Sequence, residues 1–316
     1  MKKFMKRSAI LALALILAGV LISVTATSIV GAERIDEVVA QSTDGRVHMN
    51  LNPFSDAFGI SVLENGVISN GSEVAVDFDS DYKIYTGDVE KFRLGSNVSE
   101  LLMDVGNCEL IWKPSDDENF YVEAKAAGKL QAYVEDEELF VKAAKKGMKK
   151  VAHNCKITLY VPEEYFFDRV VVSLGAGMLN LGKVYAKVVD LELGAGQIEM
   201  EYLKAEDCSI EVGMGEVQVQ DMDVDTLDVE VGMGAVHLAG DIHEKAELEC
   251  AMGQLELTVE GSEDDFNYEV NAAMGNLTIG KQSFSGLGSS RTVDNDADKN
   301  MQLDCSMGNL NVLFTR

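Results

Sequence analysis

Proline is scarce in this sequence, with 3 among 316 residues against 28 glycines. Proline turns are therefore excluded as the general means of bending the chain, and glycine is expected to take that place. Basic residues are few as well, with 27 Lys and Arg against 53 Asp and Glu and a formal net charge of -26. Because such a charge repels phosphate backbones, the composition argues against nucleic-acid binding.

Motifs for catalysis and for cofactors are also missing. The sequence contains no nucleophile elbow, zinc motif or P-loop, and its paired glycines precede strand-like segments, whereas a dinucleotide fingerprint opens a helix. The one tryptophan, Trp112, supplies little of the aromatic groove that a polysaccharide-cleaving enzyme needs. We therefore expect a non-enzymatic protein without cofactors, and we keep a polysaccharide-active β-helix enzyme as a remote alternative.

The N-terminus has the pattern of a membrane-targeting segment. Four cations among the first seven residues precede an unbroken apolar and glycine stretch from Ala9 to Ile22. Residues 1–32 are predicted to be an uncleaved signal-anchor or, as an alternative, a cleaved signal peptide. The cations hold the N-terminus inside, so either form exports the rest of the chain. The expected location is a bacterial cell membrane, single-pass with an extracytoplasmic C-terminal domain, or secretion after cleavage.

A short glycine motif recurs seven times in the second half of the chain. The copies are GAGMLNL from Gly175, GAGQIEM from Gly194, GMGEVQV from Gly213, GMGAVHL from Gly232, AMGQLEL from Ala251, AMGNLTI from Ala273 and SMGNLNV from Ser306. The first five copies follow one another at steps of 19 residues, and a weaker relative, VGNCEL, begins at Val105. A fixed short period of this kind is typical of stacked repeats.

Hydrophobic residues alternate on both sides of each motif. They stand seven, five and three positions before the glycine at the third position of the motif, and two and four positions after it. The alternation therefore changes phase at that glycine. A strand, a glycine corner and a second strand in each repeat predict an all-β fold, a single-chain parallel β-solenoid (β-helix) with about 19 residues per coil. The corner glycines are Gly177, Gly196, Gly215, Gly234, Gly253, Gly275 and Gly308.

The chain divides into four predicted regions. After the N-terminal membrane helix in residues 1–32 comes a membrane-proximal region, partly irregular, in residues 33–99. Residues 100–166 read as a β-rich N-terminal cap, because a solenoid must shield the open edge of its first coil. Residues 167–316 carry the repeats, with a polar insertion at 281–300 that leaves the stack. The last coil ends without an evident cap, so its edge is predicted to support self-association.

Two residue types in the repeats raise chemical questions. The residue before the corner glycine is methionine in five copies, and its odd position predicts an inward filler and not a soft-metal ligand. The five cysteines alternate with core positions, so they are expected to be buried free thiols although an exported protein usually oxidises such residues.

Acidic residues stand at the same outward position of successive coils. Four positions before the corner glycine the repeats carry Glu192, Glu211, Glu230 and Glu249. This face is a candidate binding site for Ca²⁺ or a cationic partner, and the alternative is a solvated surface that keeps the strands soluble. Three Asp-x-Asp-x-Asp runs, from Asp77, Asp221 and Asp294, lack the Gly and the bidentate acid of an EF-hand loop. Irregular calcium sites there stay an open alternative, and no other metal ligand set is predicted.

The recurring G-x-G-hydrophobic-x-hydrophobic coils from Gly175 to Val312, with the entry strand KITLYVP before them, resemble the bacterial putative-adhesin family, a domain of unknown function built of β-strand repeats. The resemblance implies a cell-surface ectodomain on a membrane anchor, and the family offers no catalytic residues to carry over. We therefore expect an extracytoplasmic adhesin-like scaffold or binding module with a protein or glycan partner. A membrane-anchored component of envelope-stress sensing, which would need a membrane partner, is the alternative.

Overall fold

The computed structural model describes residues 61–62, 68–69, 76–144, 155–285 and 289–316. They fall into two compact units. The described part of the first is an antiparallel pair, β1 (Ser61–Val62) with β2 (Ile68–Ser69). All described residues from 76 onward belong to the second unit, which contains every repeat. The predicted anchor in residues 1–32 and most of the membrane-proximal region lie outside the described residues.

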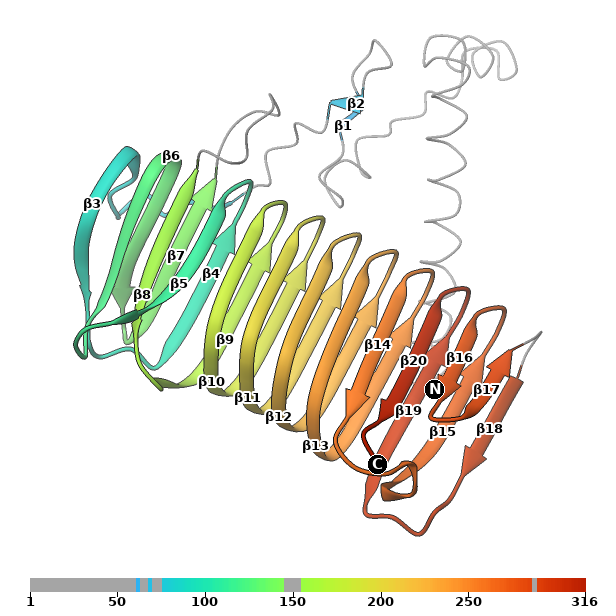
Figure 1. The fold of residues 1–316 in the computed structure, drawn as a ribbon. Coiled ribbons are helices and arrows are strands. Elements are labelled where there is room, and N and C mark those ends of the chain that lie inside the picture. Colours follow the sequence, from blue (N-terminus) through green and yellow to red (C-terminus); the bar gives the residue numbers. More distant parts are fainter. Residues whose placement is uncertain (1–60, 63–67, 70–75, 145–154, 286–288) are drawn as a thin grey trace, which may run out of the picture. The chain divides into compact units, whose positions relative to one another are not determined.

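The regular repeats form long strands that pair in parallel (Figure 1). They are β9 (Phe166–Leu174), β10 (Met178–Leu193), β11 (Gln197–Val212), β12 (Glu216–Val231) and β13 (Ala235–Cys250). Equivalent residues of successive repeats are register partners, as in the series Leu179, Ile198, Val217 and Val236. The sequence period is therefore the register of the sheet, so each residue type recurs in a straight row across the strands.

The core is formed by the inward rows of these strands. All residues at the five predicted apolar positions are buried, for example Ile210, Val212 and Val217 in one repeat. The predicted alternation is confirmed. A further buried pair follows in most repeats, such as Leu203 with Ala205 and Met222 with Val224, because each strand continues beyond the two predicted segments. Burial of each large aliphatic side chain contributes about 1.5–3 kcal/mol to stability, so the rows are the main source of cohesion.

The C-terminal strands do not stack in chain order. They are β14 (Gln254–Val259), β15 (Phe266–Ala272), β16 (Asn276–Ile279), β17 (Gln282–Ser285), β18 (Ser289–Val293), β19 (Lys299–Cys305) and β20 (Asn309–Phe314), with a short 3₁₀ helix η2 (Glu263–Asp265) before β15. Strand β19 pairs with both β13 and β15, and β20 pairs with both β14 and β16. The last repeat of the chain thus lies between the two repeats that precede it in sequence.

Antiparallel strands from the polar insertion lie beyond β15 and β16. Strand β17 pairs with β16 and β18 pairs with β15. The insertion was predicted to leave the stack, and instead its described residues extend it. The prediction of self-association relied on an open edge at the last strand of the chain. That strand, β20, pairs with a strand on each side, so it does not offer an open edge.

The N-terminal strands show the same departure from chain order. They are β3 (Tyr85–Gly95), β4 (Glu100–Val105), β5 (Glu109–Ser115), β6 (Phe120–Glu135), β7 (Glu138–Ala144) and β8 (Lys156–Pro162). Strands β4 and β5 pair in parallel between β7 and β8 on one side and β9 and β10 on the other. Strand β6 is antiparallel to β7, β8 and β3. The weak repeat at Val105 is therefore a true member of the series.

The predicted fold class, a single-chain parallel β-solenoid, is wrong. The all-β part of the prediction holds, but strands β3 to β20 belong to one hydrogen-bonded order that closes as a barrel of mixed strand orientation. The physical reason lies at the two ends of the parallel series, where antiparallel strands occupy hydrogen-bonding edges that a purely parallel stack leaves open.

The described residues do not test the predicted membrane helix. Among the described residues, no helix has the length and apolar character needed to cross a bilayer. The segment for which an anchor was predicted lies outside them, so the anchor stays a prediction.

Candidate functional site

The acidic residues predicted to share a face lie in one row. Glu192, Glu211, Glu230 and Glu249 are register partners across β10 to β13, and Asp304 of β19 is the partner of Glu249. We call these five residues the acidic file. Glu192, Glu211 and Glu230 are exposed, and Glu249 and Asp304 are half-buried. Because parallel strands lie about 4.8 Å apart, the carboxylates are held closer together than unconstrained like charges would lie.

Basic residues pair with two acids of the row next to the acidic file. In the row two residues earlier, Asp190 pairs with Arg169 at 2.7 Å and Glu247 with Lys245 at 2.7 Å. Within the described part of the chain, no Lys, Arg or His nitrogen lies within ion-pair distance of Glu192 or Glu211. The file therefore carries negative charge outward.

One further acid continues the same row on the N-terminal side. Asp104 of β4 pairs with Ser173 of β9, which in turn pairs with Glu192. Burial raises the pKa of the Asp104 carboxyl, and the nearby Lys142 opposes that effect. In the sequence, the only signal for this residue was the weak repeat at Val105, which follows it directly. The register of that repeat became evident only from the pairing of β4 with β9.

The corner glycines are required by close packing between successive corners. A Cβ atom on Gly234 would lie 2.3 Å from the carbonyl oxygen of Gly215, and one on Gly215 would lie 2.6 Å from that of Gly196. The same approach recurs at Gly253, Gly275 and Gly308. Only Gly177 among the seven has a positive φ, at 159°. At the other corners named above, the reason for glycine is therefore the close approach of the neighbouring corner.

The methionines of the corners point outward, and the prediction that they fill the interior is wrong. Backbone hydrogen bonds link one corner to the next, which puts five methionines in a row. In spatial order this methionine strip consists of Met214, Met233, Met252, Met307 and Met274. Met214, Met307 and Met274 are 39%, 40% and 63% exposed, and Met233 and Met252 are half-buried. At the corner the chain bends, so the odd-position rule of the preceding strand no longer applies.

A shallow groove of about 670 Å³ runs over four adjacent corners. Its lining includes the strip residues Met214, Met233 and Met252, the corner glycines between them, and Glu216, Gln254 and Asn309 of the following strands. The groove thus combines apolar thioethers with polar groups that can donate or accept hydrogen bonds.

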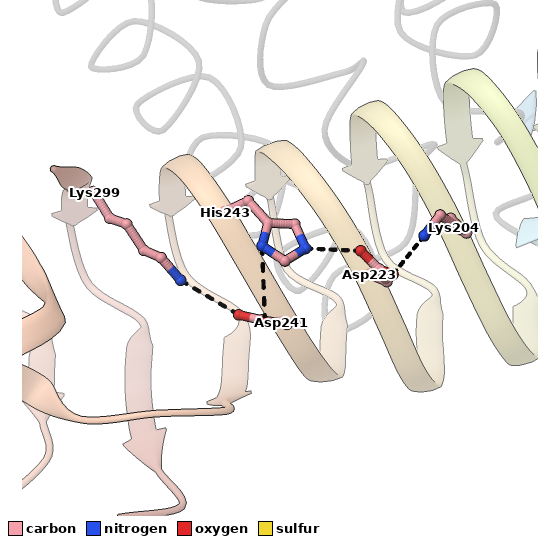
Figure 2. A network of polar contacts seen from close by, with 5 residues as sticks. All are labelled: Lys204, Asp223, Asp241, His243 and Lys299. Carbon is pink, nitrogen blue, oxygen red and sulfur yellow. Dashed lines mark hydrogen bonds and ion pairs between the residues drawn. The ribbon is translucent and has the colours of Figure 1, made fainter.

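A separate polar network connects side chains of successive repeats (Figure 2). Asp223 accepts a hydrogen bond from Lys204 Nζ at 2.7 Å and contacts His243 Nε2 at 2.8 Å. His243 Nδ1 lies 3.8 Å from Asp241, which also pairs with Lys299 at 3.5 Å. Lys204 and His243 hold the pKa of the Asp223 carboxyl below its usual value. Lys204 and His243 thus both engage the central acid of the second Asp-x-Asp-x-Asp run.

The other two acidic runs form local turns. The Asp81 N–H donates to the Asp79 carboxylate at 2.9 Å, and the Asp296 N–H donates to that of Asp294 at 3.0 Å. No group of three or more His, Cys, Asp or Glu residues in the described ranges is arranged to hold a metal ion.

The cysteines behave as the sequence predicted. Cys108, Cys155, Cys208, Cys250 and Cys305 are all buried and free. Burial raises the pKa of the Cys208 thiol to about 12. The thiols therefore pack as small apolar groups and take no part in the exposed surfaces.

Residues 98–241 match the family described as Toastrack DUF4097. No curated protein matches the chain. The chain is similar to a putative adhesin from Bacteroides fragilis, with 11% identity, a TM-score of 0.41 and coverage of 73% of this chain and 97% of that one. It is also similar to a putative lipid binding protein from Parabacteroides distasonis, at 17% identity, TM-score 0.41 and coverage of 73% and 98%. A putative adhesin from Parabacteroides distasonis has 13% identity, a TM-score of 0.37 and coverage of 74% and 98%.

The matched segment begins just before β4 and ends within β13, so it contains most of the regular repeats and most of the acidic file. Residues 98–241 are thus similar to the Toastrack DUF4097 family, and the predicted resemblance to a family of domains of unknown function is confirmed.

Proposed function

We propose that this chain is a non-enzymatic adhesin-like binding module that works outside a bacterial cell, held at the membrane by its N-terminal segment, and that the acidic file is its contact with a cationic partner protein. The family match supports an adhesin-like module in general terms. The location and the partner are parts of this proposal.

The observation that carries the proposal is the register of the acidic file. Adjacent unit charges about 4.8 Å apart repel by about 1 kcal/mol even at the dielectric constant of water. The sheet holds the backbone of Glu192, Glu211 and their partners at this spacing, so repulsion cannot be relieved by moving the strands apart. Cations of a partner relieve it, and the rigid sheet loses little conformational entropy on binding.

The test measures binding of the immobilised full chain to poly-lysine at increasing salt. The test variant carries Glu192→Gln, Glu211→Gln, Glu230→Gln and Glu249→Gln. The control variant carries Glu201→Gln, Glu206→Gln, Asp221→Asn and Glu244→Gln, which remove the same charge from exposed positions outside the file. We expect the test variant to bind at least about tenfold more weakly, and the control to bind nearly as the unaltered chain does. Equal weakening in both variants would mean that net charge alone attracts poly-lysine, and the proposal would fail.

A further inference from the structure

The methionine strip gives the surface an apolar element that a soluble sheet does not need. Ile84, Phe166, Met178, Met214, Met274, Met307 and Leu313 are the exposed large hydrophobic residues of the described ranges, and three of them belong to the methionine strip. Corner-to-corner hydrogen bonds, such as Met233 N–H to the Gly213 carbonyl at 2.7 Å, hold the strip straight. Contiguous apolar surface of this kind marks an interaction site more often than scattered residues do.

The strip runs alongside the acidic file. Each strip methionine follows a file residue by three positions in the same repeat, as Met214 follows Glu211, so the backbones of the two rows lie at most about 10 Å apart. Only small residues stand immediately before the methionines: Gly213, Gly232, Ala251, Ser306 and Ala273. A low floor therefore separates a row of thioethers from a parallel row of carboxylates.

The spacing of the rows decides which partner backbone fits. Both rows advance by about 4.8 Å per strand. Residues on one face of an α-helix, at positions i, i+3 or i+4 and i+7, advance by about 5.3 Å per step. Residues on one face of an extended strand advance by about 6.7 Å. Over the four steps of the strip the helix drifts out of register by about 2 Å and the extended strand by about 8 Å.

We propose that the surface formed by the methionine strip and the acidic file beside it docks a basic amphipathic α-helix of a partner protein, with the apolar face of the helix on the strip and its cations over the acidic file. The strip is about 19 Å long, which matches about 13 helical residues. Methionine suits this role because its flexible, polarisable side chain adapts to different apolar side chains. This inference rests on the proposed function and specifies the partner segment of the same surface.

The probe is a synthetic peptide of about 14 leucines and lysines arranged to give one apolar and one basic helical face. A peptide of the same composition, scrambled to remove the two faces, has the same charge and serves as its control. Binding of each to the full chain is measured by isothermal titration calorimetry. We expect the amphipathic peptide to bind at least about tenfold more tightly than the scrambled one.

Two variants test whether the strip is responsible. The strip variant carries Met214→Gln, Met252→Gln and Met307→Gln. The control variant carries Ile84→Gln, Phe166→Gln and Leu313→Gln, which remove three exposed apolar side chains from elsewhere on the surface. Thermal melting verifies that both variants fold. We expect the strip variant to lose the preference for the amphipathic peptide and the control variant to keep it.

NMR of methyl-labelled methionine gives a second measurement on the unaltered chain. Addition of the amphipathic peptide is expected to shift the strip methyl resonances and to leave the buried Met103, Met200, Met222 and Met301 unchanged. Equal affinity for both peptides, or a strip variant that keeps the preference, overturns the helix-docking inference. If poly-lysine binding still depends on the acidic file in that case, the proposed function survives. If poly-lysine binding is also independent of the file, both fail.

Discussion

Cys250 and Cys305 are register partners in the adjacent parallel strands β13 and β19, although a long stretch of chain separates them. Both are buried and free, and the hydrogen bond that the Cys250 thiol shares with Cys305 as donor, together with burial, raises the pKa of Cys250. The Cys305 thiol also lies 3.3 Å from the Gly308 carbonyl oxygen, and a Cβ on Gly275 would lie 2.5 Å from the Cys305 sulfur. The pair shows how the last strands of the chain are inserted into the core of earlier ones.

The first prediction concerns these thiols. A thiol reagent must reach the sulfur atom that it attacks, and burial keeps all five cysteines away from solvent. We expect no alkylation of the native chain at about pH 8 within minutes, and five labels per chain after denaturation without reductant. Mass spectrometry of the labelled protein counts them. One or three labels in the denatured chain would reveal a disulfide and contradict the packing described for Cys250 and Cys305.

The second prediction concerns the corners. Gly234→Ala places a Cβ 2.3 Å from the Gly215 carbonyl oxygen, so successive strands must move apart. We expect a loss of about 1–3 kcal/mol in the free energy of unfolding, measured by urea denaturation. Gly182→Ala is the matched control, because a Cβ there meets nothing within 4 Å. That substitution is expected to change stability by less than about 1 kcal/mol. Similar losses in both would show that close corner packing is not the reason for glycine.

The third prediction concerns pH and the network around Asp223. Its folded-state pKa is lowered by Lys204 and His243. The carboxylate therefore adds stability above its unfolded-state pKa of about 3.9, and that stability is lost as pH falls through the folded-state value. We expect Asp223→Asn to cost at most about 1 kcal/mol at about pH 7, because the pair is partly exposed, and to cost less at a strongly acid pH, where the carboxylate becomes protonated.

Urea denaturation at both pH values measures this difference. Asp221→Asn removes the same charge from the same strand without breaking the ion pair with Lys204, and it is expected to be nearly neutral at both. A cost of Asp223→Asn that persists unchanged in acid would contradict an electrostatic origin.

The fourth prediction concerns the edge covered by the polar insertion. Strands β17 and β18 pair with β16 and β15 and occupy their hydrogen-bonding edges. Replacing residues 281–298 with a short glycine–serine linker exposes those edges, and exposed parallel strands recruit other chains. We expect the altered chain to form concentration-dependent oligomers in size-exclusion chromatography with light scattering. At the same concentrations, the unaltered chain is expected to form fewer or none of them. An altered chain that elutes as the unaltered one does would show that the insertion does not protect an edge.

The local pattern was sufficient to predict much of the strand content and the candidate site. Alternation on each side of the corner glycines identified the buried rows, because inward and outward positions of a strand are fixed by its own backbone. Constant spacing between copies placed Glu192, Glu211, Glu230 and Glu249 in one row, since a parallel register repeats at the sequence period. The buried thiols followed from the same alternation.

The tertiary structure decided what depends on contacts between distant segments. No local pattern specifies that β19 enters between β13 and β15, or that β4 lies beside β9, because pairing preferences of neighbouring repeats are nearly the same. The antiparallel edges, and with them the fold class, were missed for that reason. The outward methionines were missed because a residue at a bend no longer follows the alternation of its strand. The sequence by itself thus determined the rows and their chemistry. The order of the strands and the exposure of the corners were decided only in the folded chain, by which backbone edges could pair.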